Sequence, residues 1–161
     1  MVDIREATIE DLDQVLALNG TLMQTHLQYD EYYRLNDASS EVYTAYFRRL
    51  IEDDTARLLV ALKSETIIGF ITGKIEPRPP VFAIPQKGEI NSVFVKAPFR
   101  RRGIGGQLLR RMFDWFTERG VEYVELSVDV KNTASMNVWI SCGFEPWQLI
   151  MKRQLDRSNS G

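Results

Sequence analysis

The sequence predicts one α/β domain in which helices flank a mixed β-sheet. Three observations support this prediction. Strand-like and helix-like apolar patterns alternate along the 161 residues. The order strand, loop, helix, strand between residues 89 and 128 implies a parallel strand pair. The apolar content of 44% and the charged content of 26% are those of a globular protein that buries a core.

Short local patterns predict the elements of the N-terminal half. Thr8-x-x-Asp11 resembles a capping box and indicates that a helix begins there. Four prolines between residues 75 and 87 predict an extended loop with little strand pairing. The other expected elements are a strand at 2–7, a second helix capped within 37–40 with a buried stripe of Val42, Tyr46, Leu50 and Ile51, and a hairpin of 58–62 and 66–75.

The C-terminal half is predicted to contain the central strand and the helix that follows it. Apolar residues recur at helical spacing from Ile104 to Phe116, directly after the strand Glu89–Val95. The further expectations are a strand at 121–128, a short helix at 132–142 ended by Gly143, a final strand at 144–155 and a flexible tail at 157–161. Residues 1–156 then form one domain.

The loop between the central strand and its helix predicts a phosphate site. It contains Arg100, Arg101 and Arg102, followed by Gly103, Ile104, Gly105 and Gly106. The arginines lie at the positive end of the helix dipole, where cations are unfavourable unless an anion compensates them. Glycines in the first turn leave backbone N–H groups uncovered for such an anion. A solvated basic loop is the alternative, and the spacing matches neither a nucleotide P-loop nor a dinucleotide fingerprint.

Charge and composition exclude several classes of function. The net charge of −2 divides into −5 for residues 1–88 and +3 for residues 89–161. The basic half suits a polyphosphate cofactor and the acidic half a cationic amine, whereas nucleic-acid binding would need more basic charge. One histidine and one cysteine provide no metal-ligand cluster and no internal disulfide. Without a signal peptide or a membrane-spanning run, we expect a cytoplasmic protein.

Two motifs resemble the GNAT N-acetyltransferase superfamily. Arg100-x-x-Gly103-x-Gly105 is similar to the family's acetyl-coenzyme A signature, and the resemblance extends from Ile4 to about Leu155. It implies a mixed sheet of six to seven strands with about four helices. It also implies acetyl-coenzyme A as cosubstrate, gripped at its diphosphate by residues 100–106. Main-chain groups of this strand would pair with the pantetheine arm: the Val93 N–H would polarise the thioester carbonyl, and Phe94 and Val95 would line the arm.

The second motif departs from the family pattern. Asn132, Gly143 and Phe144 match Asn-x-x-Ala-x-x-x-Tyr-x-x-x-Gly-Phe, but Ser135 replaces the alanine and Trp139 replaces the tyrosine. That tyrosine often protonates the leaving thiolate, and an indole N–H is not a usable acid at neutral pH. By resemblance, Asn132 would lie at the coenzyme. Trp139 is then either a core residue or a wall beside the coenzyme.

Glu89 is the candidate general base. Presenting a primary amine uncharged at neutral pH costs about 4–5 kcal/mol, which a nearby carboxylate can lower. Strict alternation would put Glu89 on one face of its strand with Asn91, Val93 and Val95, so that Asn91 could hold a bridging water. Glu89 also matches the position of the catalytic glutamate in many family members. The alternative is an ordinary carboxylate at the strand edge.

The sequence does not identify the acceptor. By analogy with the family, Tyr29 and Tyr33 would lie on the acceptor side, and the acceptor could be a small-molecule or a peptide amine. Two other functions remain open. The missing tyrosine suits a non-catalytic domain that binds or senses acyl-coenzyme A, and the arginine loop suits an anion-binding interaction module. The short run from Gly143 to Leu155 also leaves open a homodimer in which a second subunit completes the pocket.

Overall fold

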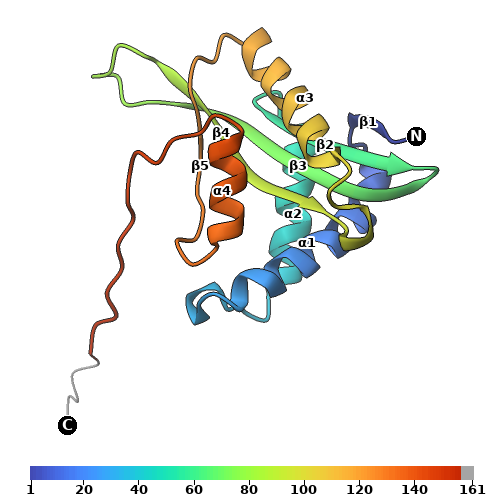
Figure 1. The fold of residues 1–161 in the computed structure, drawn as a ribbon, viewed down its shortest axis with the longest axis horizontal. Coiled ribbons are helices and arrows are strands. Elements are labelled where there is room, and N and C mark those ends of the chain that lie inside the picture. Colours follow the sequence, from blue (N-terminus) through green and yellow to red (C-terminus); the bar gives the residue numbers. More distant parts are fainter. Residues whose placement is uncertain (157–161) are drawn as a thin grey trace. The chain divides into compact units, whose positions relative to one another are not determined.

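The computed structural model describes residues 1–156, and its contacts divide the chain into one unit of residues 1–127 and a second that begins at residue 128. The first unit contains a five-stranded sheet in the order β1-β2-β3-β4-β5 (Figure 1). All neighbouring pairs are antiparallel except β4 and β5, which are parallel as the sequence predicts. The strands are β1 (Asp3–Glu6), β2 (Ala56–Lys63), β3 (Thr66–Pro77), β4 (Gln86–Val95) and β5 (Val124–Leu126).

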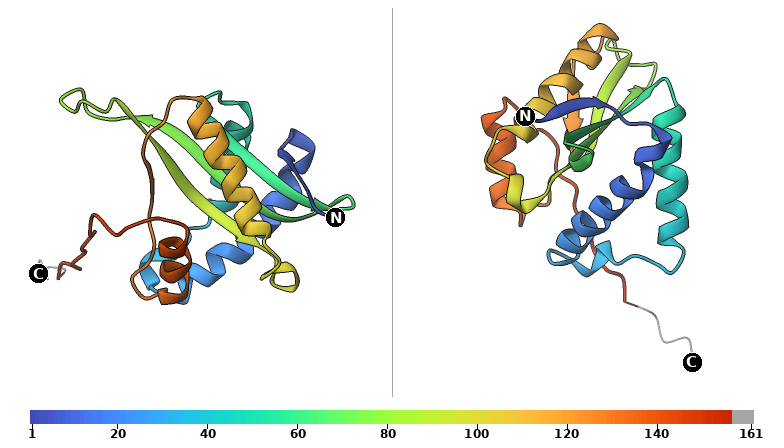
Figure 2. Two further views of the ribbon diagram at one scale, coloured as in Figure 1. Left: turned by 45° about the horizontal axis from the view of Figure 1, so that its top comes forward. Right: turned by 90° about the vertical axis from the view of Figure 1, so that its right-hand side faces the viewer.

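Helices cover both faces of this sheet. α1 (Leu12–Leu27) and α2 (Ser39–Glu52) pack on one face, and α3 (Ile104–Glu118) packs on the other (Figures 1 and 2). On the first face, apolar side chains of both helices surround Phe70 and Phe94, and the ring of Phe47 stands edge-on to that of Phe70 at 5.8 Å. The expected stripe of α2 is wrong at Val42, which is 60% exposed, because the helix turns Phe47 inward instead.

Two glycines allow α3 to lie directly against the strands. A Cβ at Gly73 would come within 2.3 Å of the sulfur of Met112, and one at Gly88 within 2.8 Å of the ring of Phe116. A side chain at Gly88 would meet the packed ring of Phe116, which cannot move aside cheaply, and one at Gly73 would first displace the end of Met112 and then meet the same ring. α3 therefore has a fixed position beneath the centre of β3 and β4.

The capping box predicted at Thr8 is present and also ties β1 to α1. The buried carboxylate of Asp11 accepts hydrogen bonds from the Thr8 backbone N–H at 2.7 Å and from Arg5 Nη1 at 2.6 Å. The Arg5 guanidinium lowers the pKa of Asp11 below its ordinary value, and burial acts in the opposite direction. The box precedes a short 3-10 turn, Ile9–Asp11, which leads into α1.

The strands differ from the sequence predictions in three places. β3 and β4 extend into the proline-rich segment and pair at Glu76 with Lys87 and at Pro77 with Gln86, because a proline at a strand end loses little ladder bonding. β5 is shorter than the predicted 121–128. The predicted strand at 144–155 is wrong, since none of residues 144–156 is in a strand. Five strands are thus present in residues 1–156, against the six to seven that the resemblance implies.

The second unit is described by itself. It contains α4 (Thr133–Ser141), which begins directly after Asn132 and is followed by Gly143 with a φ of +94°. The predicted helix at 132–142 is therefore present, and Gly143 adopts the left-handed conformation expected of a helix end. The predicted tail, residues 157–161, lies outside the described residues. No helix within residues 1–156 has the length and apolar character needed to cross a bilayer.

Asp11→Asn should destabilise the fold by about 2–3 kcal/mol, since charge-assisted hydrogen bonds to a buried carboxylate are lost. A lowered pKa in the folded state contributes stability above the unfolded value near 3.9, and this stability is lost as pH falls through the folded value. Urea unfolding between pH 2 and 7 should show this loss in the wild type and not in Asp11→Asn. Asp13→Asn, an exposed carboxylate of the same helix, is the control and should change stability by less than about 0.5 kcal/mol.

Candidate active site

The loop from Lys96 to Gly106 turns the chain from the end of β4 into α3. A 3-10 turn, Ala97–Phe99, follows the strand. Arg100 then folds back: its Nε donates to the carbonyl oxygen of Val95 at 2.7 Å, and its guanidinium lies 5.5 Å from the centre of the Phe94 ring. Arg101 and Gly103 adopt positive φ angles of 62° and 79°. Arg100 thus braces the loop, although it is exposed like Arg101 and Arg102.

Six consecutive backbone amides in this loop have no acceptor. Within residues 1–156, the N–H groups of Arg101 to Gly106 donate no hydrogen bond, and the first bond of the helix runs from the Gln107 N–H to the Gly103 oxygen at 3.0 Å. Ideal Cβ atoms at Gly103 and Gly105 meet nothing within 4 Å, and one at Gly106 meets only Arg110 at 4.0 Å. The donors therefore face open space at the positive end of α3, an arrangement that fits a diphosphate.

β4 and β5 separate beside this loop. Their parallel pairing covers Gly88, Glu89 and Ile90 and then stops, although β4 continues to Val95. The Lys96 N–H donates to Ile68 on the β3 side, so alternation directs the peptide groups of Val95 and Val93 to the opposite edge. The bond from Arg100 to the Val95 oxygen agrees with this direction. Beyond Ile90, the peptide groups of Val93 and Val95 therefore face an edge of β4 that β5 does not cover, whereas Phe94 pairs with Phe70 of β3.

A β-bulge changes which residues of β4 share a face. Thr72 pairs with Ser92 and Gly73 pairs with Ile90, so Asn91 is an extra residue in β4. Glu89, opposite Lys74, therefore lies on the face of α1 and α2 together with Ser92 and Phe94. Val93 and Val95 lie on the face of α3. The prediction of one shared face for Glu89, Val93 and Val95 is wrong, because a bulge shifts the alternation by one residue. Asn91 itself is exposed.

Five charged side chains gather on the α1 and α2 face at this end of the sheet, namely Lys74, Glu76, Lys87, Glu89 and Glu125. Two ion pairs form: Lys74 Nζ lies 2.9 Å from Glu76 Oε1, and Lys87 Nζ lies 2.5 Å from Glu125 Oε2. Glu89 is half-buried between them and has no ion pair within residues 1–156. Burial raises the pKa of Glu89, the hydrogen bond and charge of Glu76 raise it further, and Lys87 and Lys74 oppose this rise.

Tyr46 and Thr72 are neighbours of Glu89 that the sequence identified at most as core residues. Thr72 is 1% exposed on β3, and Tyr46 reaches it from α2. Burial raises the pKa of the Tyr46 phenol, the neighbouring Thr72 and the charge of Lys74 oppose this rise, and the charge of Glu89 adds to it. If the predicted hairpin 58–75 had been paired with strand 89–95, Thr72 could have been placed near Glu89. Nothing in the sequence indicates that α2 places the phenol of Tyr46 there.

The remaining predicted residues lie on two separate elements. Tyr29 and Tyr33 are half-buried beyond the end of α1, where the Tyr33 ring is 5.4 Å from that of His26. In the second unit, Asn132 Oδ1 accepts from the Ser135 N–H at 3.1 Å and thereby caps α4. The half-buried Trp139 ring stands edge-on to Phe144 at 5.5 Å. Asn132 therefore has a structural task of its own, and Trp139 packs within its own unit.

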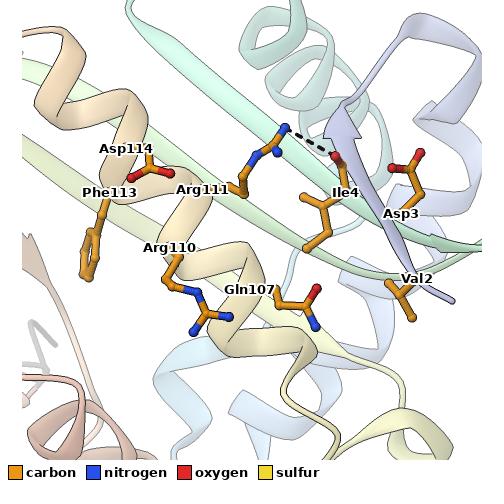
Figure 3. A pocket seen from close by; sticks show the side chains of 8 residues that line it. All are labelled: Val2, Asp3, Ile4, Gln107, Arg110, Arg111, Phe113 and Asp114. Carbon is orange, nitrogen blue, oxygen red and sulfur yellow. Dashed lines mark hydrogen bonds between the residues drawn. The ribbon is translucent and has the colours of Figure 1, made fainter.

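An open cavity of about 550 Å³ lies elsewhere, between β1 and α3 (Figure 3). Arg110 and Arg111 line it from the helix together with Asp114, and Asp3 lines it from the strand. Arg111 Nη2 reaches the Ile4 carbonyl oxygen at 3.5 Å. None of the predicted site residues lines this cavity. Among residues 1–156, no cluster of three or more histidine, cysteine or acidic side chains is arranged to bind a metal.

Comparison with known proteins identifies the family. Residues 22–144 match the acetyltransferase (GNAT) family. The chain belongs to this family. It is 28% identical over 153 residues to an uncharacterised N-acetyltransferase of Methanocaldococcus jannaschii. This alignment covers 91% of this chain and 62% of that relative's length. It is 25% identical to the aminoalkylphosphonate N-acetyltransferase of Salmonella typhimurium, over 89% of this chain and 84% of that protein.

Solved structures share the fold. The aminoglycoside N-acetyltransferase AAC(6')-Iy, in complex with a bisubstrate analogue of coenzyme A, superimposes with a TM-score of 0.76. It is 23% identical, and the match covers 97% of this chain and 99% of that chain. The mixed α/β fold is therefore that of the GNAT family, and the relatives named here are N-acetyltransferases. The free amides at the start of α3 fit the diphosphate of coenzyme A.

Gly105→Glu should weaken binding of acetyl-coenzyme A at least tenfold, which corresponds to about 1.4 kcal/mol. The new carboxylate would stand among the amides that the diphosphate needs, yet it has room and favours a helix N-terminus. The melting temperature should therefore stay the same or rise while calorimetry detects weaker binding. Gly20→Glu, in an equally open position of α1, is the matched control. Equal affinity in both variants would place the diphosphate elsewhere.

Proposed function

We propose that the protein transfers an acetyl group from acetyl-coenzyme A to a primary amine by direct attack in a ternary complex. The observation that carries this proposal is the pairing of two features on β4. Free amides and an open strand edge lie at its C-terminal end, and one half-buried carboxylate without an ion pair lies nearer its start. Residues 1–156 would act as one domain, and the family match at 22–144 spans both units.

The cosubstrate would be held mainly by main-chain groups. The amides of residues 101–106 would bind the diphosphate, with Arg101 and Arg102 as counter-charges and Arg100 as the brace of the loop. The Val93 N–H would polarise the thioester carbonyl, and Val95 and Phe94 would line the pantetheine arm. Asn132 and Trp139 stay assigned to the coenzyme by resemblance alone, since Asn132 caps its own helix.

Glu89 would act as the general base. The acceptor nitrogen must lose one proton before or during its attack on the acetyl carbon, and Glu89 would take that proton directly or through a water held by Asn91. The new bond joins nitrogen to the acetyl carbon, and the bond from that carbon to sulfur breaks. A pKa raised towards neutrality suits this role, because a stronger base removes the proton more readily. The thiolate leaves without help from Trp139 and is protonated by water.

The acceptor would be a cationic amine. Three carboxylates against two lysines give the face around Glu89 a net negative charge that attracts an ammonium group. Relatives and structural neighbours named for aminoalkylphosphonate and aminoglycoside acceptors have amine substrates of small size. Tyr29 and Tyr33 stay assigned to the acceptor by family analogy. A homodimer and a cytoplasmic location likewise stay predictions.

Glu89→Gln should lower kcat/KM at neutral pH at least tenfold, the low end of general-base catalysis. The affinity for acetyl-coenzyme A should not change, because Glu89 is not among the residues of the loop. Steady-state kinetics and calorimetry on the same preparation measure both quantities. Glu65→Gln, in the exposed turn between β2 and β3, is the control. Wild-type kinetics in Glu89→Gln would remove this carboxylate from the reaction.

The alternative is a domain that binds acyl-coenzyme A without turnover, and the specific observation in its favour is Trp139 in place of the family's tyrosine. Thiol release measured with a panel of polyamines, amino sugars, aminophosphonates and peptides separates the two functions. We expect amine-dependent thiol release with at least one class. Tight coenzyme binding with no release on any amine would support the sensor.

A further inference from the structure

The ion pair beside the candidate base has a geometry that suggests a second role. On β3, Thr72, Lys74 and Glu76 alternate onto the face of α1 and α2, opposite Ser92, Glu89 and Lys87 of β4. Lys74 is the direct partner of Glu89 across the strands, and Glu76 is its diagonal neighbour, within reach of a long side chain. Lys74 nevertheless turns along its own strand to Glu76, with 2.9 Å between Nζ and Oε1.

The register and the Lys74–Glu76 ion pair leave the carboxyl group of Glu76 beside that of Glu89. Two neighbouring carboxylates repel each other when both are ionised, so one of them takes up a proton more readily. The lysine on Glu76 favours the ionised form of that group, so Glu89 is the carboxyl group that takes up the proton. Glu89 is also the more deeply placed of the two, between the ion pairs Lys74–Glu76 and Lys87–Glu125.

We propose that Glu76, held by Lys74, is a positioning residue for Glu89, and that the two carboxyl groups share one proton in the resting enzyme. The inference rests on the proposed role of Glu89 as base. Glu76 would orient the Glu89 carboxyl by accepting its hydrogen bond and would set the pH at which Glu89 is ready to accept a proton from the substrate. Only protons enter or leave the pair, and they come from solvent or from the substrate amine.

The charges that face the pair agree with this assignment. The pKa of Glu76 is lowered, first by the hydrogen bond from Lys74, whereas the pKa of Glu89 is raised by burial and then by Glu76. Lys74 and Lys87 act against the rise at Glu89, and the pKa of each lysine is itself raised by its own carboxylate partner. Glu125 from β5 is paired with Lys87, and Tyr46 from α2 is the remaining titratable group near Glu89.

The pair would also select the charge of the acceptor. When the shared proton leaves, two neighbouring carboxylates remain, and a primary ammonium can donate to both. One proton then passes from the ammonium nitrogen to an oxygen of Glu89, which leaves the nitrogen lone pair free to attack. A neutral or anionic acceptor would gain nothing from the second carboxylate.

Two substitutions with opposite effects test the proposal. Glu76→Gln removes a negative neighbour, so the titration midpoint of Glu89 should fall by about one pH unit. Lys74→Met removes a positive neighbour, so the midpoint should rise. Glu65→Gln, in the exposed turn before β3, should leave it unchanged. Carbon-13 NMR of the glutamate side-chain carboxyl groups follows the midpoint without turnover, and the signal lost in Glu89→Gln assigns it.

The acid limb of the pH profile of kcat/KM, measured with an amine that supports turnover, should move in the same two directions. Shifts in one common direction, or no shift in either variant, would overturn the proposal, since general damage to the site moves both variants alike. The outcomes also separate the two claims. If the NMR midpoints shift in opposite directions but Glu89→Gln has wild-type activity, the Glu76–Glu89 pair is supported and the role of Glu89 as general base is rejected. If Glu89→Gln loses activity but Glu76→Gln and Lys74→Met leave the titration midpoint of Glu89 unchanged, Glu89 remains the general base and the proposed pair is rejected.

Discussion

The contact between α3 and the glycines of β3 and β4 is the constraint on which the site depends. Because Gly73 and Gly88 have no side chains, Met112 and Phe116 of the helix rest directly on the strands. The start of α3 must then lie where β4 ends, since a loop of eight residues, 96–103, connects the two. This places the free amides of residues 101–106 beside the open edge of β4. Packing in the core thus fixes the position of polar groups at the surface.

Two unfavourable arrangements of charge occur on β4 and its loop, and each has a physical reason in a bound molecule. Each arginine at the positive end of a helix dipole destabilises the helix by a few tenths of a kcal/mol. A diphosphate bound there would attract both the arginines and the dipole. A half-buried carboxylate without a cation is costly to ionise, which raises its pKa and makes it a better base. Such unfavourable charges are expected at functional sites, because polar groups that already have partners gain little free energy from binding a ligand.

The structural features that the sequence predicted correctly are those set by neighbours along the chain. The glycines and arginines of residues 100–106 indicate free amides at a helix start, and the helix does begin at Ile104. The hairpin of β2 and β3, the capping box at Thr8 and the helix end at Gly143 are equally local. Predictions that needed partners across the sheet were less successful. The predicted buried stripe of α2 did not include Phe47, and the predicted strand within residues 144–156 is not formed. Both failed because the burial of an apolar segment depends on what packs against it.

The sequence by itself determined the family resemblance, the free amides of residues 101–106 and the position of Glu89 on the central strand, because each depends on residue types at fixed spacing. Only the tertiary structure decided what surrounds Glu89. The bulge at Asn91 reverses the alternation of β4, the register with β3 brings Lys74 and Glu76 to its side, and α2 adds Tyr46. The physical reason is that strand register and helix docking are set by contacts between distant segments, and one extra residue in a strand changes every face beyond it.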